Sequence, residues 1–438
     1  MHTLEWRRFG ELLAVPLRNG LNRPTKVRGS GAKMVNMGEL FAYSRIGDVE
    51  MERVPVSDRE AEHYLLQPGD LLFARQSLVF SGAGKCSLFV GAPEPVTFEG
   101  HIIRARLDPD LADAAFYYYL FNSSLGRQLI ETIVEQVAVA GIRGSDLKEL
   151  EVLYPPLDEQ RAIAHILGTL DDKIELNRRM NATLEAIARA IFKSWFVDFD
   201  PVHAKARGEQ PYGMDADTAA LFPDSFENSE LGPIPAGWGV KRFGEISEKP
   251  QYGYTASAQD VPVGPRFLRI KDINKAPWIE WANVPYCKLS ESDHEKYKLH
   301  AGDIVIARMA DPGHSAFIED EVDAVFASYL IRFRSVDATL DRYLQFWLRS
   351  DSYWSQVEGT KTGTTRSSLN AQVLSSFRLV LPPVEIAAKF SDYVTALRQM
   401  IVRNNEEIRT LSVLRDALLP KLISGEIRIG DVESELTA

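Results

Sequence analysis

The residues with the clearest chemical potential form a basic stretch near the N-terminus. Between Glu11 and Glu39 the chain contains no acidic residue. It contains five cationic residues, Arg18, Arg23, Lys26, Arg28 and Lys33, and the amide residue Asn22 lies among them. Guanidinium and ammonium groups bind phosphate oxygens, and amides bind the edges of bases. These residue types in a loop-like stretch predict a nucleic-acid contact, although a solvated basic loop fits the same pattern.

Further candidates lie after two short apolar runs and in two polar segments. Arg75 and Gln76 follow the run 71–74, and Arg308 follows the run 304–307. The other candidates are Tyr252, Tyr254 and Thr255 beside a glycine, and Lys361, Thr362, Thr364 and Arg366 in a flexible basic segment. Rings, hydroxyls and cations together suit a nucleic-acid surface. For Arg75 and Arg308 an alternative is an ion pair with Asp70 or Asp303 in the same strand motif.

Catalytic motifs are not found. The segment 82–87 (GAGKCS) resembles a phosphate-binding loop, but its first glycine is replaced by Val79 and its Ser/Thr by Cys86. The segment 154–157 (YPPL) has the wrong residues at both ends for an adenine methyltransferase tetrad. The eight His and two Cys residues are scattered without zinc-ligand spacing. We therefore expect a non-enzyme that binds no metal and no cofactor of its own.

Composition sets the broad class. The chain has 438 residues, 45% hydrophobic and 25% charged, with a net charge of −11, which favours two or three globular domains. Segments 1–155 and 236–380 have net charges of only −3 and 0, so most of the excess negative charge lies in the segments between and after them. No apolar run could span a membrane and no apolar signal core is seen, so we expect a cytoplasmic protein.

The sequence is internally duplicated. The segment 68–75 (PGDLLFAR) matches 301–308 (AGDIVIAR), and 98–106 (FEGHIIRAR) matches 326–334 (FASYLIRFR). A third match, 153–156 (LYPP) with 380–383 (VLPP), follows in the same order. Chance similarity of common strand patterns is the alternative, but three ordered matches favour two copies of one unit. Each Gly-Asp pair predicts a turn that enters a buried strand.

Each copy ends in a long heptad pattern. One apolar column runs through 163, 170, 177, 184 and 191, and its counterpart through 390, 397, 404, 411 and 418. A period of 3.5 is typical of a coiled-coil seam. Asn177 and Asn404 occupy the same column near the middle of each helix, so in an antiparallel pair their amides would meet and set the register. Alternatively, both lie at the edge of the seam and face water.

The expected fold class is α+β, with two similar mixed α/β domains separated by two long antiparallel helices that form a coiled coil, in a pseudo-two-fold repeat. The predicted boundaries are 1–155 for the first domain, 156–200 for its helix and 201–235 for a linker. The second domain then spans 236–380, its helix 381–428 and a tail 429–438.

This layout resembles the specificity subunit of a type I restriction-modification enzyme. The segments that carry the resemblance are 155–160 (PPLDEQ), 177–179 (NRR) and 184–196 (LEAIARAIFKSWF) in the first half, 381–383, 404–406 and 414–427 in the second, and both Gly-Asp…Ala-Arg strands. They extend over nearly the whole chain.

The resemblance implies a non-catalytic, sequence-specific subunit that binds double-stranded DNA at a bipartite target, one recognition domain per half-site. The helix pair would set the spacing and dock two modification subunits that use S-adenosylmethionine to methylate adenine N6. Restriction subunits in the full complex would use ATP and Mg²⁺. A modification-only system and a coiled-coil scaffold without DNA binding remain alternatives. The target, the gap and the oligomeric state do not follow from the sequence.

Overall fold

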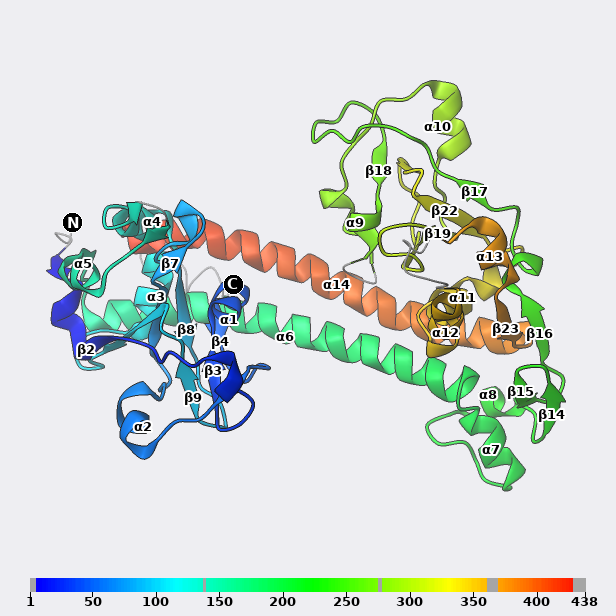
Figure 1. Ribbon diagram of the computed structural model, residues 1–438, viewed down its shortest axis with the longest axis horizontal. Helices are drawn as coiled ribbons and strands as arrows, with labels where there is room; N and C mark the ends of the chain where they lie inside the picture. The colour runs from blue at the N-terminus through cyan, green and yellow to red at the C-terminus, as the bar shows by residue number, and fades with distance from the viewer. Residues whose placement is uncertain (1–4, 137–138, 275–277, 361–368, 428–438) are drawn as a thin grey trace. The chain divides into compact units, whose positions relative to one another are not determined.

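The computed structural model describes residues 5–136, 139–274, 278–360 and 369–427. The chain forms two compact units, 1–178 with 404–438 and 179–403. Each unit combines a mixed α/β domain with one half of two long helices, α6 (Leu157–Phe196) and α14 (Val384–Ile423) (Figure 1). The expected α+β class with a repeated domain is confirmed.

The first unit is built around a five-stranded sheet in the order β2-β10-β6-β8-β4 and a three-stranded sheet in the order β5-β3-β9. Its strands are β1 (Trp6–Arg8), β2 (Leu13–Asn19), β3 (Ala32–Val35), β4 (Arg45–Ile46), β5 (Arg53–Val54), β6 (Leu71–Ala74), β7 (Gln76–Ser77), β8 (Cys86–Phe89), β9 (Val96–Phe98), β10 (Ile102–Leu107), β11 (Glu135–Gln136), β12 (Ala140–Gly141) and β13 (Glu151–Leu153). Its short helices are α1 (Met37–Ala42), α2 (Asp58–Tyr64), α3 (Ala114–Asn122), α4 (Ser124–Glu131) and α5 (Gly144–Glu149), with 3-10 turns at Phe9–Leu12, Thr25–Val27 and Phe80–Gly82.

The second unit repeats this plan. Its main sheet has the order β17-β22-β19-β20, which matches β2-β10-β6-β8, and the parallel pair β18-β21 matches β3-β9. The strands are β14 (Phe226–Ser229), β15 (Gly232–Pro235), β16 (Gly239–Arg242), β17 (Gln251–Tyr252), β18 (Arg266–Leu268), β19 (Asp303–Ala307), β20 (Ser315–Phe317), β21 (Ala324–Phe326), β22 (Leu330–Arg334) and β23 (Arg378–Leu381). The short helices are α7 (Asp200–Ala206), α8 (Ala216–Leu221), α9 (Ile270–Ile273), α10 (Glu291–Tyr297), α11 (Asp341–Trp347), α12 (Asp351–Gly359) and α13 (Ala371–Ser376), with 3-10 turns at Phe243–Glu245, Trp281–Asn283 and Ala338–Leu340.

A buried aspartate begins the central strand of each unit. Gly69 and Gly302 turn the chain with φ of 94° and 89°, a conformation that favours glycine. The next residue, Asp70 or Asp303, is 0% exposed. Each carboxylate accepts a hydrogen bond from the backbone N–H three residues earlier, at 2.8 Å in both units. The predicted turn into a buried strand is confirmed.

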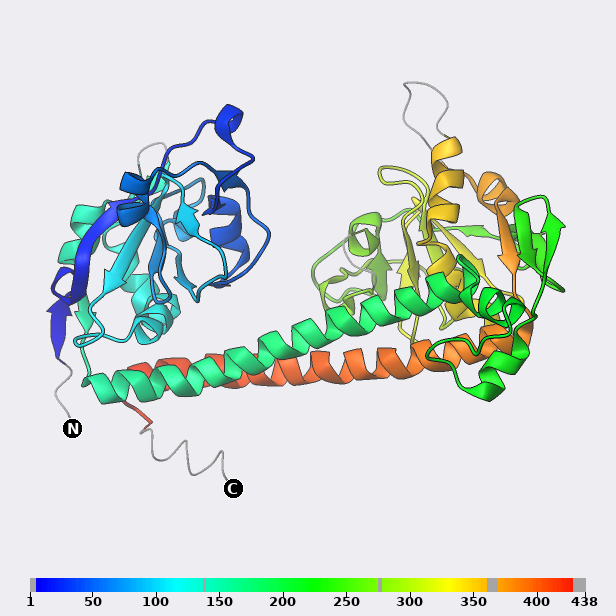
Figure 2. The same cartoon turned by 90° about the horizontal axis from the view of Figure 1, so that it is seen from below.

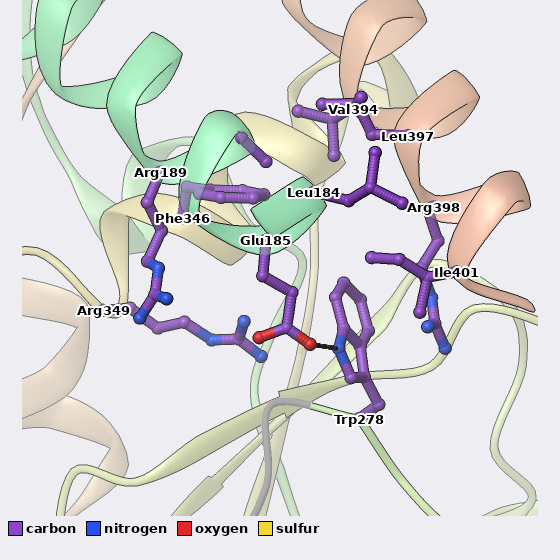
Figure 3. A pocket seen from close by; sticks show the side chains of 11 residues that line it. Leu184, Glu185, Arg189, Trp278, Phe346, Arg349, Val394, Leu397, Arg398 and Ile401 are labelled. Carbon is purple, nitrogen blue, oxygen red and sulfur yellow. Dashed lines mark hydrogen bonds between the residues drawn. The ribbon is translucent and has the colours of Figure 1, made fainter. Parts of the chain in front are cut away.

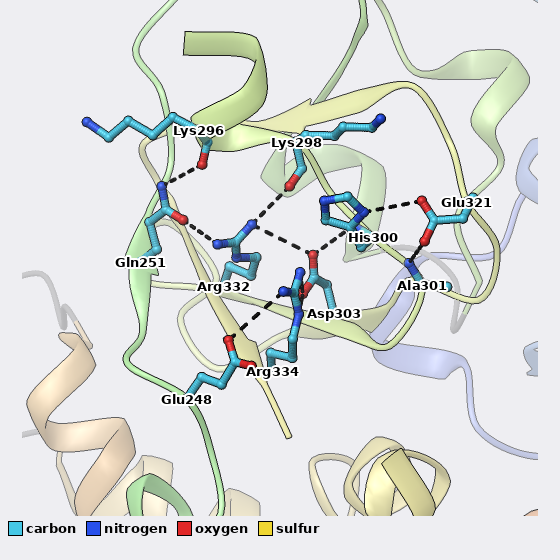
Figure 4. A network of polar contacts seen from close by, with 10 residues as sticks. All are labelled: Glu248, Gln251, Lys296, Lys298, His300, Ala301, Asp303, Glu321, Arg332 and Arg334. Carbon is cyan, nitrogen blue, oxygen red and sulfur yellow. Dashed lines mark hydrogen bonds and ion pairs between the residues drawn. The ribbon is translucent and has the colours of Figure 1, made fainter. Parts of the chain in front are cut away.

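The neighbouring strand supplies the cation for each aspartate. Arg106 of β10 binds both oxygens of Asp70 at 2.7 Å. In the second unit Nε of Arg334 on β22 binds Asp303 at 2.8 Å, and Figure 4 shows Arg332 of the same strand beside it, 3.9 Å from the carboxylate. A buried carboxylate without such a partner would be strongly destabilising. This Asp-Arg clamp therefore joins the two central strands of each sheet.

The segment 201–235, expected to be a linker, is folded. It contains α7, α8 and the hairpin β14-β15. Val202, Phe222 and Ile234 are 0%, 1% and 3% exposed and belong to the core of the second unit. The segment was predicted as a linker between the two halves, but these scattered apolar residues bury enough surface to fold it.

Within each unit, α6 lies beside α14 in antiparallel orientation (Figures 1 and 2). In the first unit Asp171 binds Arg415 at 2.7 Å, whereas Lys173 and Asn177 bind Glu407 at 3.3 and 2.9 Å. As the residue number increases along α6, the number of its contact residue on α14 decreases, so the two helices are antiparallel. In the second unit the ring of Phe390 packs against both Phe192 and Trp195, and the predicted seam positions of α6 there are largely buried.

The amide at the centre of the seam has a different partner from the one expected. Asn177 is 1% exposed, so its position in the seam is buried. Its Nδ2 donates to Glu407, where the heptad register predicts the amide of Asn404. A carboxylate is the stronger acceptor because it is charged, and this hydrogen bond lowers the pKa of Glu407. Asn404, one helical turn away, is half-buried.

None of the helices in the described part of the chain is both long and apolar enough to cross a bilayer.

Asp171 provides a matched stability test of the helix pair. Its carboxylate accepts hydrogen bonds from Arg415 and from the buried Tyr119 of α3, whereas its neighbour Asp172 is exposed and pairs with Arg45. We expect Asp171→Ala to lower the free energy of unfolding by about 1–3 kcal/mol, because the Tyr119 hydroxyl loses its acceptor. Asp172→Ala should cost about 0–1 kcal/mol.

Urea denaturation of both variants measures the difference. The two substitutions change helix propensity equally, so equal midpoints would show that the buried carboxylate does not stabilise the pair.

Candidate nucleic-acid interface

Arg75 and Arg308 directly follow the central strands β6 and β19 of the two units. The carboxylates with which they could have paired, Asp70 and Asp303, are bound to other arginines. Nη1 of Arg75 donates instead to the carbonyl of Gly100 at 3.2 Å, and the Arg308 guanidinium lies over the Tyr252 ring, 4.9 Å from its centroid. Neither arginine has an ion pair among the described residues. Their remaining N–H groups can therefore bind phosphate or a base edge.

In the first unit, two predicted residues meet at Gly100 and a third follows in the chain. Asn22 packs so closely that a Cβ at Gly100 would lie 2.2 Å from its Oδ1. Arg75 binds the carbonyl of the same glycine, and Gln76 follows as an exposed residue of β7. The amide and the guanidinium at this glycine form a donor and acceptor set suited to base edges, and Gln76 adds a second amide next to Arg75 in the chain.

In the second unit, an aromatic ring takes part in the equivalent site. Tyr252 is 40% exposed, its hydroxyl accepts from the N–H of Ala371 at 3.0 Å, and its ring lies below Arg308. This arrangement holds both side chains at the surface. Thr255 is exposed nearby in the chain, whereas the half-buried Tyr254 ring packs on Tyr297 at 5.3 Å.

Three of the predicted basic residues hold carboxylates within their own unit. Arg23 binds Glu60 at 2.6 Å, and Lys33 binds Asp48 at 2.6 Å. Arg28 binds Glu52 and also donates to the side chain of Asn36 at 3.1 Å. The stretch contains no acid, but its partners come from α2 and from loops later in the chain. These contacts favour a structural role for the three cations.

The other members of the basic stretch are more accessible. Lys26 is exposed and has no ion pair among the described residues. The half-buried Arg18 lies over the ring of Tyr64, 5.2 Å from its centroid. Lys361, Thr362, Thr364 and Arg366 lie outside the described residues.

An exposed apolar loop beside Gln76 was missed by the sequence analysis. Leu78, Val79 and Phe80 are 94%, 60% and 38% exposed. The segment 71–93 contains no acidic residue, and Lys85 at its end donates to the carbonyl of Phe41 at 2.7 Å. Large apolar side chains at such exposure mark an interaction site. The sequence signal that could have revealed this loop is the triplet Leu-Val-Phe between a strand and a Gly-rich turn, because three large apolar residues in a row are not typical of a solvated loop.

The corresponding loop of the second unit is held to the domain. Asp311 accepts from Asn274 at 2.7 Å, and the Tyr353 hydroxyl donates to the carbonyl of Gly313 at 2.9 Å. The two units thus share a framework and differ in the loop beside the terminal arginine.

The structural role of Arg23 makes a pH-dependent prediction. Its hydrogen bond, followed by those from Ser57, lowers the pKa of the Glu60 carboxyl from 4.5 to about 2. A depressed carboxyl pKa stabilises the fold above pH 4.5, and this contribution is lost as the pH falls toward 2. Arg23→Gln should therefore raise the Glu60 pKa and lower the thermal midpoint at pH 7 more than at pH 3.

Lys26→Gln is the matched control and should leave both quantities unchanged. Carboxyl NMR titration and melting curves at the two pH values measure them. A Glu60 pKa that stays near 2 without Arg23 would contradict the assignment.

Comparison with known proteins agrees with this organisation. The family described as "Type I restriction modification DNA specificity domain" matches residues 43–186 and 235–410. The chain is 26% identical over 369 residues to the type I restriction enzyme MjaIX specificity subunit of Methanocaldococcus jannaschii, covering 82% of this chain and 80% of the relative. It is 27% identical to the HindI specificity subunit of Haemophilus influenzae, covering 64% and 70%.

A solved structure shares the fold. The crystal structure of a type I restriction-modification S subunit from M. genitalium aligns with a TM-score of 0.56 at 16% identity, covering 96% of this chain and 97% of that one. The family match covers one segment in each half, most of the chain in total, and agrees with the duplicated unit. The chain therefore belongs to the type I restriction-modification DNA specificity family.

Proposed function

We propose that this chain is the non-catalytic subunit that reads a bipartite DNA target for a type I restriction-modification complex. The observation that carries the proposal is the repeated framework, in which an Asp-Arg clamp occupies the buried carboxylate and leaves Arg75 or Arg308 at the surface. One such surface per unit suits one half-site each. The names of the related proteins support the same function.

Each surface would combine positioning with base readout. In the first unit Arg75, Asn22 and Gln76 would contact base edges, and Lys26 would contact phosphate. In the second unit Arg308, stacked on Tyr252, would contact base edges. Because the neighbouring side chains differ, the two units would read different sequences.

The helix pair would set the spacing between half-sites. Each helix is 40 residues long, about 60 Å at 1.5 Å per residue. The same helices would dock two modification subunits, which would bring S-adenosylmethionine and flip the target adenine. ATP and Mg²⁺ would act in restriction subunits.

Methylation mapping tests base readout. The chain is co-expressed with the adenine methyltransferase of its system, and N6-methyladenine is mapped across the host genome. We expect one bipartite motif with a constant gap. Arg75→Ala should relax one half of it and Arg308→Ala the other, with each change costing about 1–3 kcal/mol in DNA affinity.

Arg207→Ala is the control, because Arg207 is an exposed arginine that pairs with Glu209. If the methyltransferase methylates DNA without this chain, and the chain does not bind duplex DNA, the alternative of a coiled-coil protein scaffold would be favoured. Methylation without cleavage of unmodified DNA would favour a modification-only system.

Insertion of one heptad into each helix tests the spacing role. Seven residues added near 180 and at the matched position near 403 lengthen the pair by about 10.5 Å. At 3.4 Å per base pair, the gap in the methylated motif should grow by about 3 base pairs while both half-sites stay the same. An unchanged gap would contradict the proposal that the helices set the distance.

A further inference from the structure

Two features lie outside the proposed DNA contacts, a cavity in the second unit and the apolar loop of the first. The cavity has a volume of about 250 Å³ and lies among α6, α11 and α14 (Figure 3). Polar side chains at its wall contact one another. The indole Nε1 of Trp278 donates to Oε1 of Glu185 at 2.9 Å, and the Arg398 guanidinium lies 3.7 Å from the Trp278 ring centroid. These contacts hold Trp278 against the two long helices, and we assign no ligand to the cavity.

The loop of the first unit presents its apolar side chains to solvent. Leu78, Val79 and Phe80, the apolar tip, are 94%, 60% and 38% exposed. At 94% exposure Leu78 makes almost no contact with its own domain. Apolar surface in water is unfavourable because its burial lowers the free energy. The apolar tip is therefore stabilised when a partner covers it.

The backbone below the apolar tip is held in place. Nη2 of Arg127 donates to the carbonyls of Ser81 and Ala83, at 3.0 and 3.2 Å. The N–H of Gly84 donates to the carbonyl of Ala74 at 2.8 Å, which returns the loop to the end of β6. A loop that is ordered before binding loses less conformational entropy when a partner binds it. The apolar tip is thus presented on a fixed support.

The charge around the apolar tip favours a polyanion as that partner. The segment 71–93 contains no acidic residue, and Arg75 and Lys85 lie on either side of the apolar tip in the chain. Glu135, in the same three-stranded sheet as β7, is paired with Arg143 at 2.5 Å. Leu78 also follows Gln76, one of the proposed base contacts, by two residues. Cations beside an apolar group suit DNA, whose phosphates attract them, better than an apolar protein surface.

The second unit does not repeat the apolar tip. Its corresponding loop, 309–314, lies within the described residues and has no exposed large apolar side chain. The ring of His314 packs on Trp354 at 5.1 Å between centroids, and the carbonyl of Gly313 accepts from the Tyr353 hydroxyl. Any function of the apolar tip therefore belongs to the first unit.

We propose that Leu78 is a wedge that inserts between two neighbouring base pairs of the half-site read by the first unit. This inference rests on the proposed function, because it needs the first unit to lie on duplex DNA. Apolar side chains inserted in this way partly unstack a base step and kink the duplex by roughly 20–90°. The steps TA and CA/TG unstack most easily, so the wedge should enter one of them. The second unit would leave its half-site stacked.

Permanganate footprinting of a duplex that carries the methylated motif tests the wedge. Permanganate oxidises thymines that have lost their stacking, and the steps TA and CA/TG each contain a thymine. With the complex of this chain and its methyltransferase, we expect one reactive step in the half-site that Arg75→Ala relaxes. The thymine opposite a flipped adenine would react as well, and its signal is the internal reference.

Leu78→Ser removes the wedge, whereas Leu78→Met keeps an apolar side chain at the same place. Leu78→Ser should lower the reactivity of the step roughly fivefold, because the base pairs stack again, and Leu78→Met should retain it. Energy transfer between dyes at the two ends of the duplex measures the kink, which should be lost in Leu78→Ser alone.

Leu231→Ser is the matched control. Leu231 is a 44% exposed leucine in the turn between β14 and β15 of the second unit, so the same substitution there should leave both signals unchanged. Melting curves verify the folding of all three variants.

The outcomes separate this inference from the proposed function. Equal reactivity and equal energy transfer in the wild-type and Leu78→Ser complexes, with the effect of Arg75→Ala on the motif intact, would overturn the wedge alone. Loss of the methyltransferase from the Leu78→Ser complex, without a reactive step in the wild-type complex, would overturn it in favour of a protein contact. No duplex binding by the wild-type complex would overturn both proposals.

Discussion

Each recognition unit depends on one buried ion pair. Asp70 and Asp303 are fully removed from solvent at the start of a core strand, and each must be compensated by a cation and by the N–H groups of its own turn. Arg106 and Arg334 provide that cation from the adjacent strand. The pairing fastens the two central strands of the sheet. Arg75 and Arg308 therefore do not have to neutralise these carboxylates.

The two units keep this framework and differ where the terminal arginine reaches the surface. Arg75 lies beside amides and a protruding apolar loop, whereas Arg308 is stacked on Tyr252 and its neighbouring loop is tied down. In a duplicated scaffold, loops tolerate changes that a buried clamp does not, so the framework is kept while the surface around the terminal arginine differs.

The parts predicted correctly from the sequence are those with local or periodic signals. The Gly-Asp turns, the duplicated strands and the buried position of Asn177 all follow from residues close in the chain. Contacts with partners distant in the chain were not predicted. Arg23 meets Glu60 and Asn177 meets Glu407 only after folding. Likewise, the segment 201–235 folds because Phe222 and Ile234 reach a core made of other elements. Composition alone does not contain this information.

The first unit is discontinuous in the chain, and this affects the order of assembly during synthesis. Leu422 and Ile423 belong to the same apolar core as Phe9 and Phe73, whereas the second unit is a single stretch, 179–403. At about 5–20 residues per second, the ribosome needs roughly 12–50 s to travel from Arg178 to Leu422. Part of the core of the first unit therefore stays uncovered during this time, and the second unit is fully synthesised before the first unit is complete.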